Sequence, residues 1–317
     1  MHIMNRDLKL DGIKFIMIFL VVLGHLEYND YRLGINLVIY SFHMPVFIFL
    51  SGYFTSQNTN KEKQSKWLKQ TLLIYLFAQM AHFALEIGIE GAKSILNHKE
   101  FNTSVFSWRV LISPRLALWY LICLMYWRVA IWRVFAKVSD IKLLLISCVL
   151  ALISGIIPID HDFAFQRTFA FFPFFVLGMI FRKQELMTKL SKIPYTYALV
   201  GLLFGLIVAR LLPIYMPKFH YCNWYDPILR IIQSGLGLYL CLLIIRVLKV
   251  DFIERFAKYG AYTLWIYIGH TYLIKIGENT FLNLHLNVFT AFLLTCCYCT
   301  IFIVMANIYN SYKKNLN

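Results

Sequence analysis

The chain has 317 residues, of which 60% are hydrophobic and only 15% are charged, and this balance excludes an ordinary soluble globular domain. Its 31 Lys and Arg outnumber its 16 Asp and Glu, but the cations lie in small groups between apolar runs and form no single basic patch. The excess therefore indicates membrane topology, and a nucleic-acid partner is not expected.

A transmembrane helix needs about 20 mostly apolar residues, and ten stretches of the chain approach that length. We predict an all-α integral membrane protein with about ten transmembrane helices. The predicted spans are 12–28, 34–55, 68–88, 116–135, 141–158, 168–181, 195–213, 227–248, 261–276 and 286–309. The outer loops are short except residues 89–115, which could hold an amphipathic or re-entrant piece.

The positions of Lys and Arg predict the orientation. Most of the 31 fall on one side of the predicted spans, and the positive-inside rule makes that side cytoplasmic. Both termini are then cytoplasmic, which requires an even number of spans. We expect residues 1–317 to form a single polytopic domain of a bacterial cytoplasmic membrane. No cleavable targeting peptide, appended soluble domain, disulfide framework or metal site is expected.

The first span carries the most informative pattern, KFIMIFLVVLGH. Lys14 and His25 are eleven residues apart, so they share one helix face about 16 Å apart along the axis, and Asp11 lies on that face one turn earlier. Such groups are costly in lipid and usually face a protein interior or a wet cavity. The alternative is that Lys14 snorkels to one interface and His25 sits at the other, both as anchors.

The second span contains SFHMPVFIFLSGY, in which His43 lies well inside the membrane beside Pro45. A single intramembrane histidine can be a satisfied core residue. Two on consecutive spans are harder to explain in that way, because each raises the cost of insertion. Histidine is also the side chain best suited to move a proton near neutral pH.

These two stretches, RDLKLDGIKF…VVLGH and FHMPVFIFLSGY, resemble the acyltransferase 3 family of membrane O-acyltransferases, and most of all its stand-alone branch of fucose 4-O-acetylases and relatives. Three later stretches are also similar to family segments: LALWYLICLMYWR (116–128), RTFAFFPFFVLGM (167–179) and YTLWIYIGH (262–270). The five occur in the expected order between residues 6 and 270, so the resemblance covers most of the chain.

The resemblance implies that acetyl-CoA is the acyl donor, bound as a substrate with no resident cofactor. His25 would take the proton of an acceptor hydroxyl or form an acetyl-imidazole intermediate. Asp11 matches a family acid, and His43 would orient His25, contact the acceptor or stabilise the oxyanion. The implied donor-binding residues are Lys14, Arg6, Lys66 and Lys69. Lys66 and Lys69 stand where the family usually has Arg, and lysine cannot bind phosphate in the bidentate way that arginine does. The alternative is that these cations only set the membrane topology.

The implied acceptor-binding residues are Arg115, Trp119, Tyr120, Arg167 and His270. Interfacial Trp and Tyr are common in membrane proteins, and His270 has a structural alternative. His82 and Glu86 share a face of the third span and could be a buried pair, to which we assign no chemistry. Arg210 and Arg230 lie near outer helix ends and are interpreted as snorkelling side chains.

The predicted function is transfer of acetyl from cytoplasmic acetyl-CoA to a hydroxyl of a cell-surface or lipid-linked carbohydrate. The expected partners are therefore acetyl-CoA, a carbohydrate acceptor and the bilayer. A proton-coupled transporter or flippase for a glycan or acyl donor is the alternative, with the intramembrane histidines as a proton relay. A structural membrane scaffold is a third possibility, in which loss of His25 affects only folding.

Overall fold

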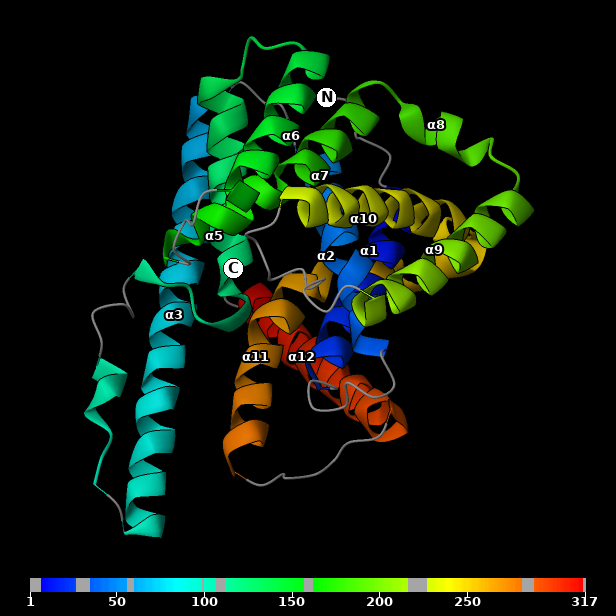
Figure 1. Ribbon diagram of the computed structural model, residues 1–317. Helices are drawn as coiled ribbons and strands as arrows, with labels where there is room; N and C mark the ends of the chain where they lie inside the picture. Colours follow the sequence, from blue (N-terminus) through cyan, green and yellow to red (C-terminus); the bar gives the residue numbers. More distant parts are fainter. Residues whose placement is uncertain are drawn as a thin grey trace. The chain divides into compact units, whose positions relative to one another are not determined.

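The computed structural model describes residues 7–26, 35–55, 60–98, 100–106, 112–156, 162–215, 227–280 and 288–315. These residues form helices and their connections, with no strand among them (Figure 1). The prediction of an all-α protein is therefore confirmed. The chain divides into two compact units: unit 1 comprises Met1–Phe54, Phe174–His270 and His285–Asn317, and unit 2 comprises Thr55–Pro173 and Thr271–Leu284.

Unit 1 is built around the first helix. Its helices are α1 (Leu8–Leu26), α2 (Ile35–Tyr53), α8 (Leu186–Ser191), α9 (Tyr195–Tyr215), α10 (Pro227–Leu248), the 3-10 helix η5 (Asp251–Tyr262) and α12 (Val288–Asn315). Helix α1 contacts α2, α10, η5 and α12. Its fully buried side chains lie at more than one side of the helix: Leu10, Ile13, Met17, Ile18 and Val22. A helix that is apolar and buried on several faces belongs to the core, and α1 is the core helix of this unit.

Unit 2 contains the longest helix. Its elements are α3 (Lys61–Asn97), η1 (Thr103–Phe106), η2 (Leu116–Leu118), α5 (Trp119–Val129), η3 (Ala130–Val134), α6 (Asp140–Ile156) and η4 (Asp162–Ala164). Two further helices, α7 (Phe165–Lys183) and α11 (Thr263–Thr280), contribute residues to both units.

Helix α3 is longer than expected. The side chain of Asn60 caps its start by accepting a hydrogen bond from the backbone N–H of Lys63 (3.1 Å). The helix then runs to Asn97, where His98 ends it in the left-handed conformation (φ 48°). The predicted span 68–88 was therefore too short at both ends, and part of the expected loop 89–115 is helical. Ala, Glu, Lys and Leu in residues 89–97 are good helix formers, which explains the extension.

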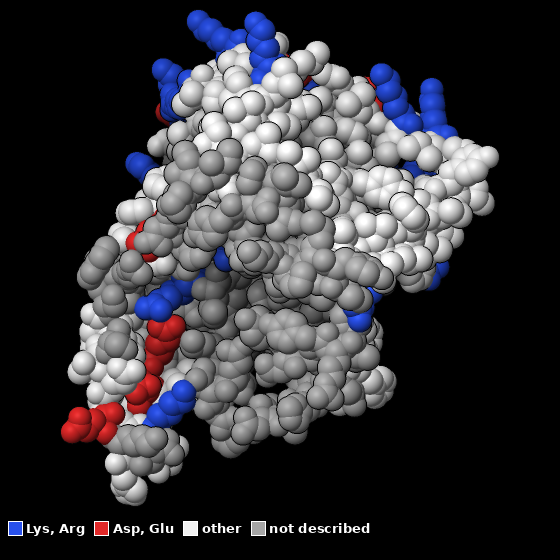
Figure 2. Space-filling model, viewed as in Figure 1, with Lys and Arg blue, Asp and Glu red and all other residues white. Residues whose placement is uncertain are grey.

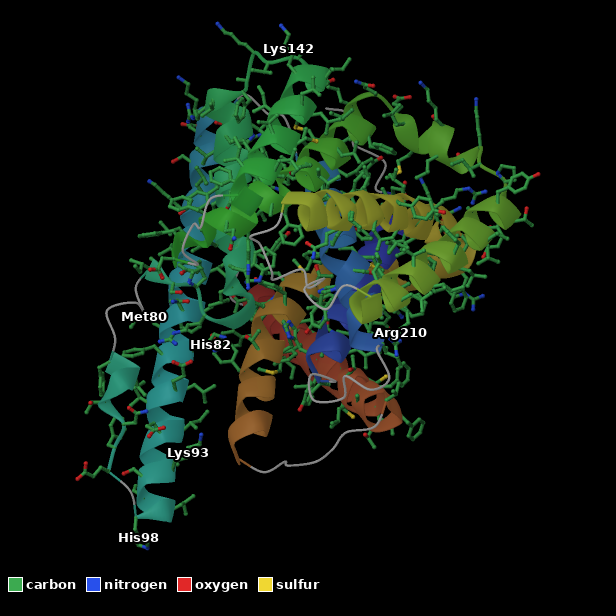
Figure 3. All side chains as sticks on the ribbon, viewed as in Figure 1. Met80, His82, Lys93, His98, Lys142 and Arg210 are labelled. Atoms are coloured by element: carbon green, nitrogen blue, oxygen red, sulfur yellow. The ribbon has the colours of Figure 1, made fainter. Side chains whose placement is uncertain are left out.

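Five of the helices in the described part of the chain are long and apolar enough to cross a membrane. They are Lys61–Leu96, Asp162–Lys183, Tyr195–Leu212, Ile231–Leu248 and Val288–Tyr309. A shorter apolar helix covers Val38–Tyr53. The number of ten spans and the cytoplasmic termini stay predictions. Figure 2 shows Lys and Arg side chains projecting near the start of α6, where Figure 3 labels Lys142. On α9 the apolar side chains of Leu203, Phe204 and Ile207 are exposed.

Helices α2 and α7 approach closely within unit 1. A Cβ on Gly52 would collide with the carbonyl oxygen of Phe175, and a Cβ on Gly178 would collide with the carbonyl oxygen of Phe49. Small residues permit such backbone contact between membrane helices. The crossing fixes the second half of α2, and with it the turn at Tyr53 and Phe54 that follows.

Candidate active site

Helix α1 carries the polar stripe that the sequence predicts. It is continuous from Leu8 to Leu26, so Lys14 and His25 lie on one face at the expected spacing of about 16 Å. Both side chains are partly buried, and Ile18 and Val21, which lie between them on this face, are buried. The stripe therefore faces protein.

The first end of the stripe is covered by η5. Asp11 is buried, with only 4% of its surface exposed, and its carbonyl oxygen lies 2.8 Å from the position that a Cβ on Gly260 would occupy. Lys14 places its ammonium 5.1 Å from the centroid of the Phe54 ring, a cation–π contact. This end of α1 thus holds a buried carboxylate and, one turn later, a partly buried cation.

Ion pairs outside the predicted span hold η5 to the start of α1. Lys9 Nζ lies 2.6 Å from Asp251 Oδ1 and 3.9 Å from Glu254 Oε1. A second pair joins Lys249 Nζ to Asp7 Oδ2 at 3.0 Å. The hydrogen bond from Lys9 lowers the pKa of the Asp251 carboxyl, and the same bond raises the pKa of Lys9.

The second end of the stripe is a cluster of imidazole and phenol rings from three helices. The ring centroids of His25 (α1) and His270 (α11) are 5.4 Å apart. Tyr40 (α2) lies between two histidines, with its ring centroid 6.1 Å from that of His25 and 5.1 Å from that of His43. We call His25, Tyr40, His43 and His270 the histidine cluster. It brings together three of the predicted site residues.

Hydrogen bonds assign the tautomers of the cluster. His43 Nδ1 lies 2.7 Å from the carbonyl oxygen of Ile39, and His270 Nδ1 lies 3.1 Å from that of Ile266. A carbonyl only accepts, so both Nδ1 atoms carry the proton, and in the neutral ring Nε2 is the acceptor. Each of these two rings is held by the backbone of its own helix.

The contacts of the Tyr40 hydroxyl assign the tautomer of His25. Its hydroxyl lies 3.4 Å from the carbonyl oxygen of Gly24, to which it donates, and 3.4 Å from Nδ1 of His25. Since the hydroxyl has one proton, it accepts from Nδ1–H of His25 while it donates to the carbonyl. His25 then presents the lone pair of Nε2, which is the form that a general base requires.

Burial distinguishes the three histidines. His43 is 2% exposed and His270 is fully buried, whereas His25 is partly exposed. A base must come within hydrogen-bond distance of the proton that it takes. Of the three rings, His25 is therefore the one that a substrate can reach in this conformation. Asp11 is fourteen residues away, about 21 Å along α1, so it does not contact His25.

The predicted acceptor residues of unit 2 form a stack of aromatic and cationic groups. The guanidinium carbon of Arg167 (α7) lies 4.8 Å from the ring centroid of Trp119 (α5), and that ring stacks on Phe171 at 5.6 Å. Tyr120 is buried, with 6% exposed. A guanidinium on an indole face is suited to both cation–π contact and hydrogen bonding to hydroxyls.

Arg115 contacts two polar side chains of α3. Its Nη1 lies 3.1 Å from Glu86 Oε2, and its backbone N–H donates to Gln79 Oε1 at 3.0 Å. Glu86 therefore has an ion-pair partner outside α3, and its suggested pairing with His82 stays a prediction. Helix periodicity placed both on one face, but it could not show that the chain near Arg115 packs against α3.

His82 contacts the second part of α11. Its Nε2 lies 2.8 Å from Thr271 Oγ1, and its ring stacks on Tyr272 with centroids 3.9 Å apart. The Tyr272 hydroxyl in turn donates to the carbonyl oxygen of Ala78 (2.7 Å). Figure 3 shows His82 on α3. These contacts fasten α11 to α3 within unit 2, and they give His82 a structural role.

Gln166 is a polar residue that sequence reasoning missed. It is fully buried next to Arg167, and neither Oε1 nor Nε2 has a hydrogen-bond partner among the described residues. The two residues before α7, Phe163 and Ala164, both have φ of 56°, a conformation that is costly for residues with a Cβ. Buried amides without a hydrogen-bond partner and strained backbone are each unusual, and their coincidence beside Arg167 marks this helix start as a candidate ligand contact.

Three predicted donor residues remain, and two of them lie in the described part of the chain. Lys66 and Lys69 lie near the start of α3 and are exposed. Arg6 lies outside the described residues. Tyr40 was also missed, although its position three residues before His43 places both on adjoining parts of one helix face.

Comparison with known proteins identifies the family of the chain. A family described as an acyltransferase domain matches residues 7–308. The chain is 29% identical over 196 residues to nodulation protein NolL of Sinorhizobium fredii (strain NBRC 101917 / NGR234). That alignment covers 56% of this chain and 49% of NolL, so the chain spans about half the length of this curated relative. No solved structure matches the chain.

Proposed function

This chain belongs to the acyltransferase 3 family, and from that membership we propose that it is a membrane O-acetyltransferase. The donor in this proposal is acetyl-CoA from the cytoplasm, and the acceptor is a hydroxyl of a cell-surface or lipid-linked carbohydrate. The protein would act as a multi-pass protein of the cytoplasmic membrane.

The observation that carries the proposal is the state of His25. It is the partly exposed one of the three imidazoles described in the histidine cluster, and the Tyr40 hydroxyl supports the tautomer with a lone pair on Nε2. A neutral imidazole with an accessible Nε2 is the group that proton transfer from an alcohol requires. The buried rings of His43 and His270 are proposed to position His25.

The proposed step conserves atoms and charge. The acceptor oxygen attacks the thioester carbonyl of acetyl-CoA while Nε2 of His25 takes the hydroxyl proton. Collapse of the tetrahedral intermediate breaks the C–S bond, and the proton passes from His25 to the leaving CoA sulfur. The products are the acetyl ester and CoA with a free thiol. An acetyl-imidazole formed on His25 is the alternative route, in which the acceptor attacks second.

The other predicted site residues divide between donor and acceptor. Lys14, Lys66, Lys69 and Arg6 are proposed to bind the phosphates and pantetheine arm of acetyl-CoA. Asp11, buried one turn before Lys14, is proposed to orient that lysine, since it lies too far along α1 to contact the reacting atoms. Arg167, Trp119, Tyr120 and Arg115 are proposed to contribute to acceptor binding, with Gln166 added from the structure.

The test uses the purified full-length protein in detergent with acetyl-CoA labelled in the acetyl group and a bacterial glycan extract as acceptor. We expect label to appear in the glycan fraction. His25→Asn should lower the rate of transfer by about 10²–10⁴ while acetyl-CoA binding persists, because asparagine keeps a polar side chain but cannot accept the proton.

The matched control is His98→Asn. His98 is exposed at the end of α3 in a left-handed conformation that asparagine tolerates. Transfer that continues at the wild-type rate in His25→Asn, or that is slowed equally in His98→Asn, would contradict the role of His25. A proton-coupled transporter predicts no covalent label in the glycan with either protein.

A further inference from the structure

A separate feature of unit 1 is an apolar groove on another face of α1. It has a volume of about 550 Å³ and is lined by α1, α2, α9 and α10. Pockets of about 300–1,000 Å³ hold small molecules in many proteins. Representative lining residues are Met17, Leu20, Val38, Phe42, Leu206 and Ile244.

Among the described residues, Arg210 is the one charged residue that lines this groove. It lies on α9 five residues before the helix ends at Tyr215, and its side chain is partly buried. Figure 3 shows it near that end of α9. A groove that is apolar along its length, with a guanidinium at one position, complements a hydrocarbon chain that ends in an anion.

We propose that this groove holds the lipid part of a lipid-linked carbohydrate acceptor, with the hydrocarbon chain along α1, α2, α9 and α10 and the phosphate against Arg210. This inference rests on the proposed function and narrows its acceptor class. It replaces the interpretation of Arg210 as a snorkelling side chain without a ligand.

The groove shares structure with the histidine cluster. Ile39 lines the groove, and its carbonyl oxygen accepts the hydrogen bond from Nδ1 of His43. Leu20 and Val38 also line it, five residues before His25 and two before Tyr40 respectively. In the predicted topology, Arg210 and His25 both lie toward the outer side of the membrane. A chain in the groove would therefore present its sugar on the side where His25 takes the proton.

The first test compares two acceptors with the full-length enzyme: a polyprenyl-diphosphate-linked oligosaccharide and the same oligosaccharide without lipid. Leu206→Trp fills the groove, and we expect it to raise KM for the lipid-linked acceptor at least tenfold without changing transfer to the lipid-free one. The matched control is Ile207→Trp, because Ile207 is the next residue of α9 and is 58% exposed on the outer face of the helix. An equal effect of Leu206→Trp on both acceptors, or no effect, would overturn the proposal.

The second test measures binding without catalysis, using a photoactivatable polyprenyl phosphate and the wild-type, Arg210→Gln and Arg210→Lys proteins. We expect labelling of α9 or α10 in the wild type, at least a fivefold loss in Arg210→Gln and recovery in Arg210→Lys. Competition by phosphatidylglycerol at equal concentration would show a general lipid site and overturn the proposal. Labelling in a wild-type protein that transfers no acetyl would support the groove and contradict the proposed function alone.

Discussion

The two ends of α1 place their polar side chains in different surroundings. At its start, Lys9 and Asp7 pair with charged partners beyond α10, and the partner carboxylate of Asp251 is largely exposed. At its end, His25 meets His270 and Tyr40 among rings that are mostly buried. Exposed ion pairs contribute little to stability because water screens them. Buried neutral rings must instead satisfy their hydrogen bonds inside the protein.

The difference indicates that the start of α1 attaches this helix to η5, whereas the end of α1 takes part in the proposed reaction. The start of α1 is held to η5 by ions and close backbone contact, and loss of one ion should change little. The end of α1 holds a ring in a single tautomer, and loss of that ring should slow the reaction strongly. Four predictions test this contrast.

The largest effect is expected at His25. His25→Asn should lower kcat for acetyl transfer by about 10²–10⁴, the range that general base catalysis usually provides. Single-turnover assays with labelled acetyl-CoA measure this loss, and the thermal unfolding temperature in detergent should stay within a few degrees of the wild type. A large fall in unfolding temperature would instead assign His25 a structural role.

The next effect is expected where η5 contacts α1. Gly12→Ala places a Cβ against the carbonyl oxygen of Ile253, and overpacking of this kind costs about 1–3 kcal/mol. The thermal unfolding temperature should therefore fall. Gly88→Ala is the control, because no atom lies within 4 Å of a Cβ at Gly88, and it should be neutral or stabilising. Equal stability of the two variants would show that η5 is not packed on α1 in solution.

A smaller effect is expected at Tyr40. Tyr40→Phe removes the hydroxyl that accepts from His25 Nδ1, and the loss of one such hydrogen bond is worth about 0.5–1.5 kcal/mol. We expect kcat to fall up to about tenfold while KM for acetyl-CoA is unchanged. Tyr239→Phe, which removes an exposed hydrogen bond to the Gly201 carbonyl, should leave kcat unchanged. A change in KM alone would place Tyr40 in substrate binding and not in positioning His25.

The smallest effect is expected at Asp251. Because Lys9 lowers the pKa of Asp251 in the folded protein, the stabilisation from this carboxylate is present above its ordinary pKa of 3.8 and is lost as the pH falls through the lower folded value. Thermal unfolding of wild type and Asp251→Asn should therefore differ slightly near neutral pH and converge at acid pH. A difference that grows as the pH falls would contradict the assigned direction of the pKa shift.

Sequence patterns could predict what depends on one helix at a time. Spacing placed Lys14 and His25 on one face, and apolar length predicted the helices themselves. Contacts between helices could not be obtained in this way. Glu86 pairs with Arg115, and Tyr40 lies between His25 and His43, because packing across helices selects these contacts. Gln166 was not predicted as a site residue for the same reason, since its burial depends on neighbours that periodicity does not identify.

The lengths of α1 and α2 have a consequence for the bilayer itself. Each has 19 residues, or about 28 Å of helix, which nearly equals the thickness of a typical hydrocarbon core. As predicted spans, helices of this length have no excess to take up by tilting, and they are too short for a thicker hydrocarbon core. Lipids with longer tails would draw His25, near the end of α1, below the interface and away from water. The turnover of this protein should therefore respond to acyl-chain length in reconstituted vesicles.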